Sequence, residues 1–366
     1  MIRVAQIMGK MECGGVEAVV MNYYRHINRE NIQFDFFVDQ DSSCPQKTEI
    51  VSLGGRVYHI PPYQKIFANM RDLKALFLEN RYSIVHAQLT TMSVFSLKVA
   101  KDCGVPVRIC HGHNTAAPGE WKKNILKYSL RPFAKTYATH CFACSRLAGQ
   151  WLFGKDILSS PRYCFVPNAI DFQKFAFQSA VREEVRRRFH LEGKFVVGHV
   201  GRFVFQKNHT FLIDIFAEVH RRNPDSVLFL LGDGPLLEKT REKVHALSLD
   251  SSVFFMGNRD DVQDFYQAFD IMLLPSHYEG FPLSLAEAQA SGLEIFCSDA
   301  ITPEICLSDH LHFISLRENS ASWAEKILQS PHPASDRTQI HLDRTYDISN
   351  AALEFEKTYE QILCEA

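Results

Sequence analysis

The sequence lacks a large excess of charge of either sign. Its 40 Lys and Arg residues nearly balance its 42 Asp and Glu residues, and the formal net charge is −2. A generic nucleic-acid-binding protein carries a strong basic excess, so the composition argues against a nucleic-acid partner.

Long hydrophobic runs are also missing. No apolar stretch reaches the roughly 18 residues that a membrane-spanning helix needs. Residues 1–8 are too short for a signal sequence and predict a first β-strand instead. Together these absences predict a cytoplasmic protein.

Metal-binding patterns are scarce as well. The ten cysteines are spread mostly singly, and the CxxC pair of Cys141 and Cys144 has no second pair with metal-ligand spacing. Asp39 and Asp41 form a DxD triplet, but it stands in an ordinary polar loop. We therefore predict reduced thiols and no metal site.

The chain is long enough for two domains. At 366 residues it exceeds one ordinary core, and its strand and helix signals alternate from the first residue, as in parallel α/β units. The pattern restarts near residue 170. We predict Rossmann-like, doubly wound domains over residues 1–170 and 171–345, facing across a cleft, and a C-terminal helix over 346–366 that packs back on the first domain.

Glycines and histidines mark the ends of strands in the first half. Gly14 and Gly15 open a helix after the first strand, where free N–H groups form an anion site, although a plain glycine turn is an equally good interpretation. The dinucleotide motif GxGxxG is absent there. His111 and His113 follow the strand predicted over 107–110, and Asn168 follows the last strand of this half. A lone histidine is usually structural, whereas a cluster at this sheet edge favours ligand binding.

Two cations flank the first strand-to-helix loop of the second half. Arg202 and Lys207 lie on either side of this loop, and Asn208 is placed to cap the next helix. Gly257 and Arg259 follow a later strand, predicted over 253–256. Two cations near the N–H groups of a helix start fit a diphosphate.

Two carboxylates stand around a strand-to-helix junction. Glu279 lies in the loop after a short buried strand, and Glu287 lies in the helix that follows. On their own, such residues are most often a solvated loop and a partner of the helix dipole. In this setting Glu287 can accept the hydroxyls of a ribose and Glu279 those of a sugar. The loop between them brings further candidate contacts: Gly280, Phe281, Pro282 and Leu283.

Two basic segments have simpler interpretations. Residues 121–135 alternate Lys and Arg with large apolar residues, which is typical of a peripheral membrane contact or of an ordinary surface helix with one face in the core. The run from Arg186 to Arg188 predicts only a solvated helix face.

Several of these motifs, in this order, resemble glycosyltransferase family 4 (GT4), a large family of retaining glycosyltransferases. The resemblance covers essentially the whole chain and is greatest to bacterial exopolysaccharide enzymes. The residues that carry it lie at 14–17, 111–115, 143–145, 151–154, 166–171, 201–208, 279–287 and 297–304.

The resemblance implies a GT-B fold and a metal-independent reaction without a cofactor. Arg202 and Lys207 would hold the donor diphosphate, Glu287 the ribose and Glu279 the transferred sugar. One histidine of the pair would sit near the reacting centre; members with a single histidine point to His111, while the doubled motif leaves His113 as the alternative.

The sequence departs from the family pattern at two positions. Pro282 replaces a commoner glycine and removes one backbone donor from the loop. Ala169 stands where a glycine is usual after Asn168.

The expected activity is that of a retaining hexosyltransferase. It would move a sugar from a nucleotide sugar, UDP-sugar by family habit, to a lipid-linked or oligosaccharide acceptor in exopolysaccharide biosynthesis. It would work in the cytoplasm or at the inner face of the cell membrane. Two alternatives stay open: a nucleotide-sugar epimerase of the same fold, and a non-catalytic nucleotide-sugar-binding protein.

Overall fold

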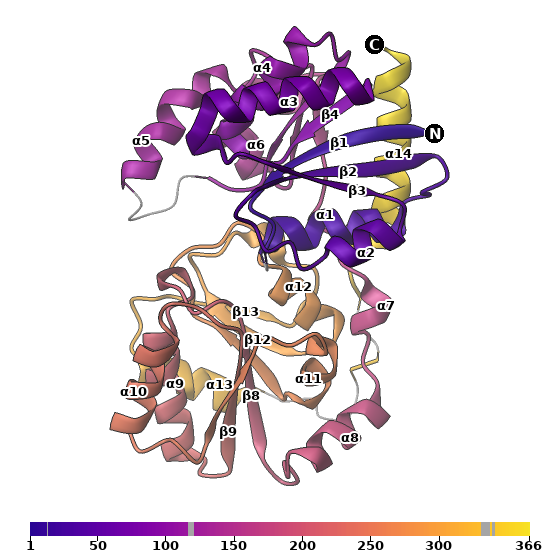
Figure 1. The fold of residues 1–366 in the computed structure, drawn as a ribbon. Helices are drawn as coiled ribbons and strands as arrows, with labels where there is room; N and C mark the ends of the chain where they lie inside the picture. Colours follow the sequence, from indigo (N-terminus) through magenta and orange to yellow (C-terminus); the bar gives the residue numbers. More distant parts are fainter. Residues whose placement is uncertain (13, 116–120, 331–336, 339–340) are drawn as a thin grey trace. The chain divides into compact units, whose positions relative to one another are not determined.

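The chain forms two compact units (Figure 1). The computed structural model describes residues 1–12, 14–115, 121–330, 337–338 and 341–366. Unit 1 consists of Met1–Ile170 and Arg344–Ala366, and unit 2 of Asp171–Asp343. The C-terminal segment therefore belongs to the first unit, although the whole second unit precedes it in the sequence.

Unit 1 is built on a parallel sheet of seven strands in the order β3-β2-β1-β4-β5-β6-β7. Its inner strands are nearly continuous apolar runs, because helices cover a parallel sheet on both faces; every residue of β2 is buried. The strands are β1 Ile2–Gly9, β2 Ile32–Asp39, β3 Arg56–Ile60, β4 Ile84–Ala87, β5 Val107–Gly112, β6 His140–Ala143 and β7 Tyr163–Phe165.

The last helix of the chain packs on this first unit. In Figure 1, α14, in yellow, runs beside the indigo strands of the N-terminus. It contacts α1, where the rings of Tyr23 and Phe355 lie 4.7 Å apart between centroids. The helices of unit 1 are α1 Gly15–His26, α2 Lys47–Ser52, α3 Ile66–Asn80, α4 Ser93–Asp102, α5 Trp121–Leu130, α6 Arg146–Phe153 and α14 Ile348–Cys364.

Unit 2 repeats the plan with six parallel strands in the order β10-β9-β8-β11-β12-β13. Only glycine fits at Gly198 of β8, because a Cβ atom there would lie 2.0 Å from the ring of Phe269. The strands are β8 Phe195–Val200, β9 Ser226–Leu231, β10 Val253–Gly257, β11 Ile271–Leu274, β12 Glu294–Ser298 and β13 Leu311–Ile314.

The helices of unit 2 include one that corrects a prediction. In α8, Arg186 is not merely solvated: with Arg182 it grips the carboxylate of Asp270, and it also donates to the carbonyl oxygens of Leu191 and Lys194. These bonds tie α8 to the start of β11. The helices are α7 Phe172–Phe175, α8 Ser179–Arg188, α9 His209–Arg222, α10 Leu237–Ala246, α11 Val262–Ala268, α12 Leu283–Ala290 and α13 Ser320–Gln329.

Each sheet has a point where the strand order reverses. This point lies between β1 and β4 in unit 1 and between β8 and β11 in unit 2. Open α/β sheets bind ligands beyond the carboxyl ends of the strands at this switch point. The predicted α/β class with two parallel-sheet halves is confirmed. No helix in the described part of the chain is both long and apolar enough to cross a membrane.

Candidate active site

The loops after β8 and β11 fasten to each other beside the switch point of unit 2. The side-chain amide of Asn208 donates to the carbonyl oxygen of Pro275 at 3.1 Å. The backbone N–H of His277 donates to the carbonyl oxygen of Gln206 at 2.8 Å. The rings of Phe205 and His277 stack at 4.4 Å. The expected side-chain cap from Asn208 is wrong, because Asn208 takes a left-handed conformation with φ 55° and turns its amide to the other loop.

This arrangement brings Lys207 to Glu279. Their Nζ and Oε1 atoms are 2.8 Å apart, and their side chains are only 14% and 8% exposed. Two neutral donors complete the setting: Ser276 Oγ donates to Oε1 at 3.1 Å, and Gln206 Nε2 donates to Oε2 at 2.8 Å. A carboxylate has about four acceptor positions. Glu279 is therefore held as an oriented acceptor with room for a further hydroxyl.

Arg202 belongs to the same loop but has a different environment. It is exposed, and its side chain has no ion pair or hydrogen bond with the residues that the structure describes. The backbone near Arg202 is closely packed. A Cβ atom on Gly232 would lie 2.3 Å from the carbonyl oxygen of Gly201, and a Cβ atom on Gly234 would lie 2.6 Å from the carbonyl oxygen of Phe203. A closely packed loop thus carries an exposed cation that has no partner among the described residues.

Glu287 projects from α12 and is held by a tyrosine. Tyr266 donates its hydroxyl to Oε2 of Glu287 at 2.8 Å, while Oε1 accepts no hydrogen bond from the described residues. Burial raises the pKa of Glu287, and the Tyr266 hydroxyl and the charges of Lys174 and Lys207 partly oppose this. One carboxylate oxygen is oriented and the other is open, as a ribose contact requires.

The loop between the two acids ends in the helix start that the sequence predicts. Pro282 takes the N-cap position of α12, and Leu283 is its first residue. Phe281 is buried, whereas Gly280 is partly exposed. Glu279 pairs in a parallel bridge with Ile301, so the segment after β12 supports this loop.

Gly257 and Arg259 follow β10. Gly257 has φ +66° and open space where a side chain would begin. Arg259 is paired with Asp261 at 2.6 Å and lies over the ring of Phe265. Arg259 would have to leave Asp261 to bind a ligand.

In unit 1 the two predicted histidines are buried and stacked. The rings of His111 and His113 lie 4.1 Å apart between centroids. His111 Nδ1 is 3.0 Å from Nε2 of His86, and His113 Nε2 is 2.6 Å from Oε1 of Gln88. Burial lowers the pKa of His113 to about 3 and holds the pKa values of His86 and His111 well below their ordinary range. All three imidazoles are therefore neutral at physiological pH.

Two side-chain nitrogens of the histidine pair are buried without a hydrogen-bond partner among the described residues. They are Nε2 of His111 and Nδ1 of His113. The two residues line a cavity of about 10 Å³, which is room for about one water molecule or hydroxyl group. Buried polar atoms normally have partners, so the cavity beside these two nitrogens is a candidate place for a polar group that the described residues do not supply.

Gly14 and Gly15 begin α1, and Asn168 follows β7. Gly14 is the N-cap residue of α1, and a Cβ atom there would lie 2.3 Å from Oε2 of Glu17. Gly15 has open space at that position. Asn168 is buried, and its Oδ1 has no hydrogen-bond partner in the described chain.

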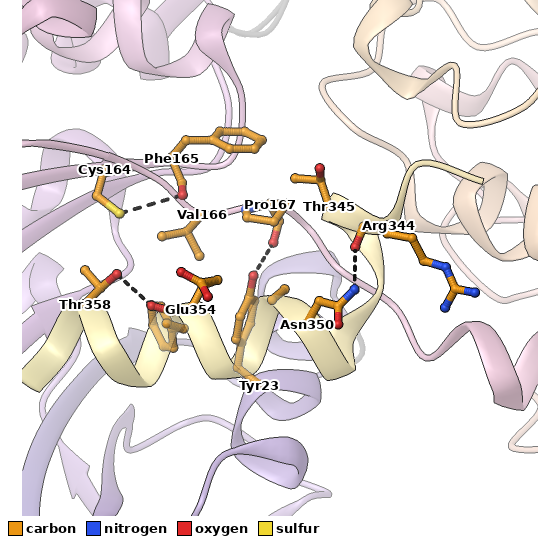
Figure 2. Close-up of a pocket in the computed structure, with 12 residues that line it drawn as sticks. Tyr23, Cys164, Phe165, Val166, Pro167, Arg344, Thr345, Asn350, Glu354 and Thr358 are labelled. Carbon is orange, nitrogen blue, oxygen red and sulfur yellow. Dashed lines mark hydrogen bonds between the residues drawn. The ribbon is translucent and has the colours of Figure 1, made fainter. Parts of the chain in front are cut away.

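A larger apolar cavity of unit 1 is lined by none of the predicted site residues. It measures about 420 Å³ and lies between α14 and the segment that follows β7 (Figure 2). Tyr23 closes one side by donating its hydroxyl to the carbonyl oxygen of Pro167 at 2.8 Å. Tyr23, Val166 and Phe355 line both this cavity and the small one beside the histidines.

The remaining motifs have structural surroundings. Cys141 and Cys144 are buried thiols, and the thiol of Cys144 donates to the carbonyl oxygen of His113 at 3.3 Å. Asp41 pairs with Lys10 at an exposed position, while burial and the charge of Asp41 raise the pKa of Asp39 to about 6. No group of three or more His, Cys, Asp or Glu residues within the described ranges could hold a metal ion.

The basic segment exposes its apolar residues. The side chains of residues 121–123 lie outside the described part of the structure. Beyond them, Ile125, Leu126, Tyr128 and Phe133 are all at least 45% exposed. The interpretation of this segment as a helix with one face in the core is therefore not favoured for these side chains.

Sequence reasoning missed the residues that hold the predicted ones in place. Gln206, Ser276 and Tyr266 fix the two acids, and His86, Gln88 and Tyr359 support the histidines. Gln206 and Ser276 are near neighbours of predicted residues, so their position was a usable signal. Tyr359 has no local signal, because it reaches the site only through the packing of α14.

Solved structures share this architecture. HepE from Anabaena, crystallised with UDP and glucose, superimposes with a TM-score of 0.80 over 98% of this chain and 100% of its own, at 18% identity. Sucrose-phosphate synthase from Thermosynechococcus elongatus gives 0.78 over 100% of both chains, at 17% identity. The fold is that of the GT-B class of glycosyltransferases.

Sequence comparison identifies the family. Residues 14–169 match the family described as glycosyl transferase 4-like domain, and residues 181–334 match glycosyl transferases group 1. Bacillus subtilis EpsF, which is named as a glycosyltransferase, is 36% identical over 335 residues, covering 90% of this chain and 87% of its own. The chain belongs to the family of glycosyltransferases in which these two domains occur together. The predicted resemblance to glycosyltransferases of family 4 and the predicted hexosyltransferase class are confirmed.

A more distant relative has a more specific name. The Escherichia coli UDP-Gal:alpha-D-GlcNAc-diphosphoundecaprenol alpha-1,3-galactosyltransferase is 25% identical over 310 residues, covering 81% of this chain and 79% of its own.

Proposed function

We propose that this protein is a retaining hexosyltransferase that moves a sugar from UDP-sugar to a lipid-linked or oligosaccharide acceptor in exopolysaccharide biosynthesis. The observation that carries the proposal is the largely shielded Lys207–Glu279 ion pair of unit 2, with the exposed Arg202, which has no partner among the described residues, on the same loop as Lys207. UDP in the HepE crystals supports the choice of nucleotide. The name of the E. coli relative supports a diphosphate-linked lipid acceptor.

In this proposal the donor is held along its length by unit 2. Glu287 accepts the ribose hydroxyls through its open oxygen, and Arg202 and Lys207 bind the diphosphate. Glu279 receives a hydroxyl of the transferred sugar. Gly257 and the backbone of residues 280–283 line the donor, and Arg259 contributes when it is released from Asp261. The predicted contacts from unit 1 are the N–H groups of Gly14 and Gly15, Asn168 and the histidine pair.

The main catalytic task is to stabilise charge on the leaving group. The bond between the anomeric carbon and the diphosphate oxygen breaks, and the sugar gains oxocarbenium character. Lys207 and Arg202 are the cations that would oppose the negative charge that develops on the diphosphate. Because Ser276, Gln206 and Lys207 already hold Glu279, it keeps its place while the sugar changes shape.

Retention would follow from attack on the face that the leaving group vacates. The acceptor hydroxyl oxygen bonds to the anomeric carbon, and its proton passes to the departing diphosphate. This step needs neither a metal ion nor a protein nucleophile. Isolation of a glycosyl group bonded to Glu279 or another side chain would contradict it.

The acceptor would be reached at a membrane surface. The exposed residues Ile125, Leu126, Tyr128 and Phe133 share their segment with Lys127 and Lys135, a combination that suits an anionic lipid surface. We therefore place the enzyme at the inner face of the cell membrane, as a peripheral protein.

Donor binding is tested first with the full chain. UDP-, GDP- and ADP-sugars are compared by thermal shift, since a ligand at 100 times its Kd stabilises the folded state by about 2.7 kcal/mol. We expect stabilisation by UDP-sugars and none by the others. Stabilisation by GDP- or ADP-sugars alone would overturn the choice of nucleotide.

Turnover then separates the reaction classes. UDP-sugar alone should be hydrolysed only slowly, and extracted lipid-linked acceptors should accelerate UDP release. Formation of an epimeric UDP-sugar without acceptor would instead identify an epimerase. Tight binding without turnover under either condition would identify a non-catalytic binding protein.

A further inference from the structure

A buried chain of hydrogen bonds links the C-terminal helix to the histidine pair. Tyr359 of α14 lies with its hydroxyl 2.6 Å from Nδ1 of His86, and Nε2 of His86 lies 3.0 Å from Nδ1 of His111. All three side chains are buried. The three residues come from α14, β4 and β5, so tertiary packing alone brings them into line.

The same hydroxyl receives a second chain of bonds that ends at His113. Gln6 donates its amide to the Tyr359 hydroxyl at 3.1 Å, and Gln88 donates its amide to Oε1 of Gln6 at 2.8 Å. The free carbonyl end of Gln88, Oε1, then faces Nε2 of His113 at 2.6 Å. Each amide uses one donor and one acceptor, so the direction of one bond dictates the direction of the next.

The directions can be followed to both ends. Because Tyr359 accepts from Gln6, its own proton goes to Nδ1 of His86, whose remaining proton is then on Nε2. That proton is donated to Nδ1 of His111, which leaves the proton of His111 on Nε2. At the other end, His113 must donate from Nε2 to Gln88, so its Nδ1 carries a lone pair.

The network therefore presents one donor and one acceptor, and these are the two unpartnered nitrogens of the pair. Both histidines are stacked and line the cavity of about 10 Å³. A hydroxyl group satisfies such a pair, because it accepts one hydrogen bond and donates another. A carboxylate or an ammonium group would leave one nitrogen unsatisfied.

We propose that Tyr359 and His86 are positioning residues that hold His111 as the Nε2–H tautomer, so that His111 and His113 together receive one hydroxyl of the transferred sugar. This inference rests on the proposed function, which places the histidine pair beside the sugar. It assigns the C-terminal helix a role in orienting the donor sugar, in addition to its role in the packing of unit 1.

The test reads the tautomer directly. Histidine labelled with ¹⁵N is incorporated into the full chain, and the two ring nitrogens of His111 are assigned by comparison with His111→Gln. We expect the wild type to carry its proton on Nε2. In Tyr359→Phe the proton should divide between the two nitrogens, whereas His86→Gln should retain Nε2–H, because its amide can accept from Tyr359 and donate to His111.

Kinetics on the same variants give the functional arm. Tyr359→Phe should lower kcat for sugar transfer about fivefold with little change in KM for UDP-sugar, which is the size of one neutral hydrogen bond. Tyr24→Phe is the matched control: Tyr24 is also fully buried in unit 1 and also bonds a glutamine, Gln33, at 2.8 Å, but it lies outside the network. The control should lose similar stability and keep kcat.

The outcomes separate the two proposals. A proton on Nδ1 of His111 in the wild type would show that Tyr359 and His86 do not set the tautomer of His111, whatever the activity. An unchanged tautomer in Tyr359→Phe would show the same. A lost tautomer with unchanged kcat overturns its part in catalysis and leaves the transferase function standing. The expected tautomers in a protein that transfers no sugar would refute the proposed function and, with it, the sugar hydroxyl as ligand.

Discussion

The two units place their candidate residues at equivalent points of similar sheets but use opposite chemistry. In unit 1 these residues are neutral and buried, with three uncharged imidazoles and two amides bonded in a network. In unit 2 they are charged and partly exposed, with an ion pair, a free arginine and a second carboxylate. The neutral residues of unit 1 are suited to forming hydrogen bonds with hydroxyl groups, and the charged residues of unit 2 are suited to binding phosphate.

This difference has a physical reason. A charge buried without a partner costs several kcal/mol, so the charged residues lie where solvent or a ligand can reach them. Neutral donors and acceptors can be buried at low cost when each has a partner, and burial then fixes their direction. The difference predicts that changes in unit 2 act mainly on charge stabilisation and those in unit 1 mainly on orientation.

The largest expected effect comes from the cation of unit 2. Lys207→Ala should lower kcat by about 10²–10³-fold, because it removes stabilisation of charge on the leaving diphosphate. Arg202→Ala should act in the same direction. Initial rates of UDP release with UDP-sugar and a lipid-linked acceptor measure both.

Lys243→Ala supplies the control for this comparison. Lys243 also forms an ion pair in unit 2, with Asp214 at 2.6 Å, but neither residue is among the predicted site residues. Unchanged turnover in both Lys207→Ala and Arg202→Ala would refute the phosphate-binding role of the loop.

Acid should weaken unit 2 through a buried histidine that lies next to its charged site. Burial, His199 and Lys207 lower the pKa of His209 to about 2, so the folded state stays unprotonated while the unfolded state takes up a proton below about pH 6.5. Stability is therefore lost as the pH falls below 6.5, by about 2 kcal/mol for this group at pH 5. His209→Leu should flatten the fall in unfolding free energy between pH 7 and 5.

Urea titrations at several pH values follow this effect. His245→Leu is the control for the loss of an imidazole, because His245 is 84% exposed in the folded protein. An equal acid loss in wild type and His209→Leu would show that His209 is not buried in its neutral form.

A smaller effect is expected at the second carboxylate. Tyr266→Phe removes the hydroxyl that orients Glu287 and opposes the rise of its pKa. We expect KM for UDP-sugar to rise about fivefold with kcat nearly unchanged, because the ribose is bound equally in ground and transition states. A fall in kcat at constant KM would place Glu287 nearer the reacting bond.

The smallest expected effect concerns the exposed apolar segment of unit 1. Leu126→Ser should reduce binding to anionic lipid vesicles about threefold, because less apolar area enters the interface. Phe67→Ser is the control, since Phe67 is 87% exposed on α3. Sedimentation with vesicles gives the bound fraction, and equal binding by both variants would argue against this segment as the contact.

Much of the fold could be predicted because its signals are local. Apolar runs predict the strands, and Gly14 and Gly15 predict a helix start close to where the structure begins α1. The predictions failed where a side chain bonds outside its own element. Asn208 occupies the predicted N-cap position of α9, but its side chain bonds Pro275 instead of capping the helix. Arg186 is predicted in solvent and instead bonds Asp270.

The sequence by itself determined the α/β class, the repeat of two parallel sheets and the candidate residues at strand ends, because these depend on periodicity and on neighbours along the chain. Only the tertiary structure decided which of those residues have partners. Tyr359 reaches His86 across 273 positions of sequence, and Lys207, in the loop after β8, reaches Glu279, in the loop after β11. Such contacts depend on strand order and helix packing, which no local pattern encodes.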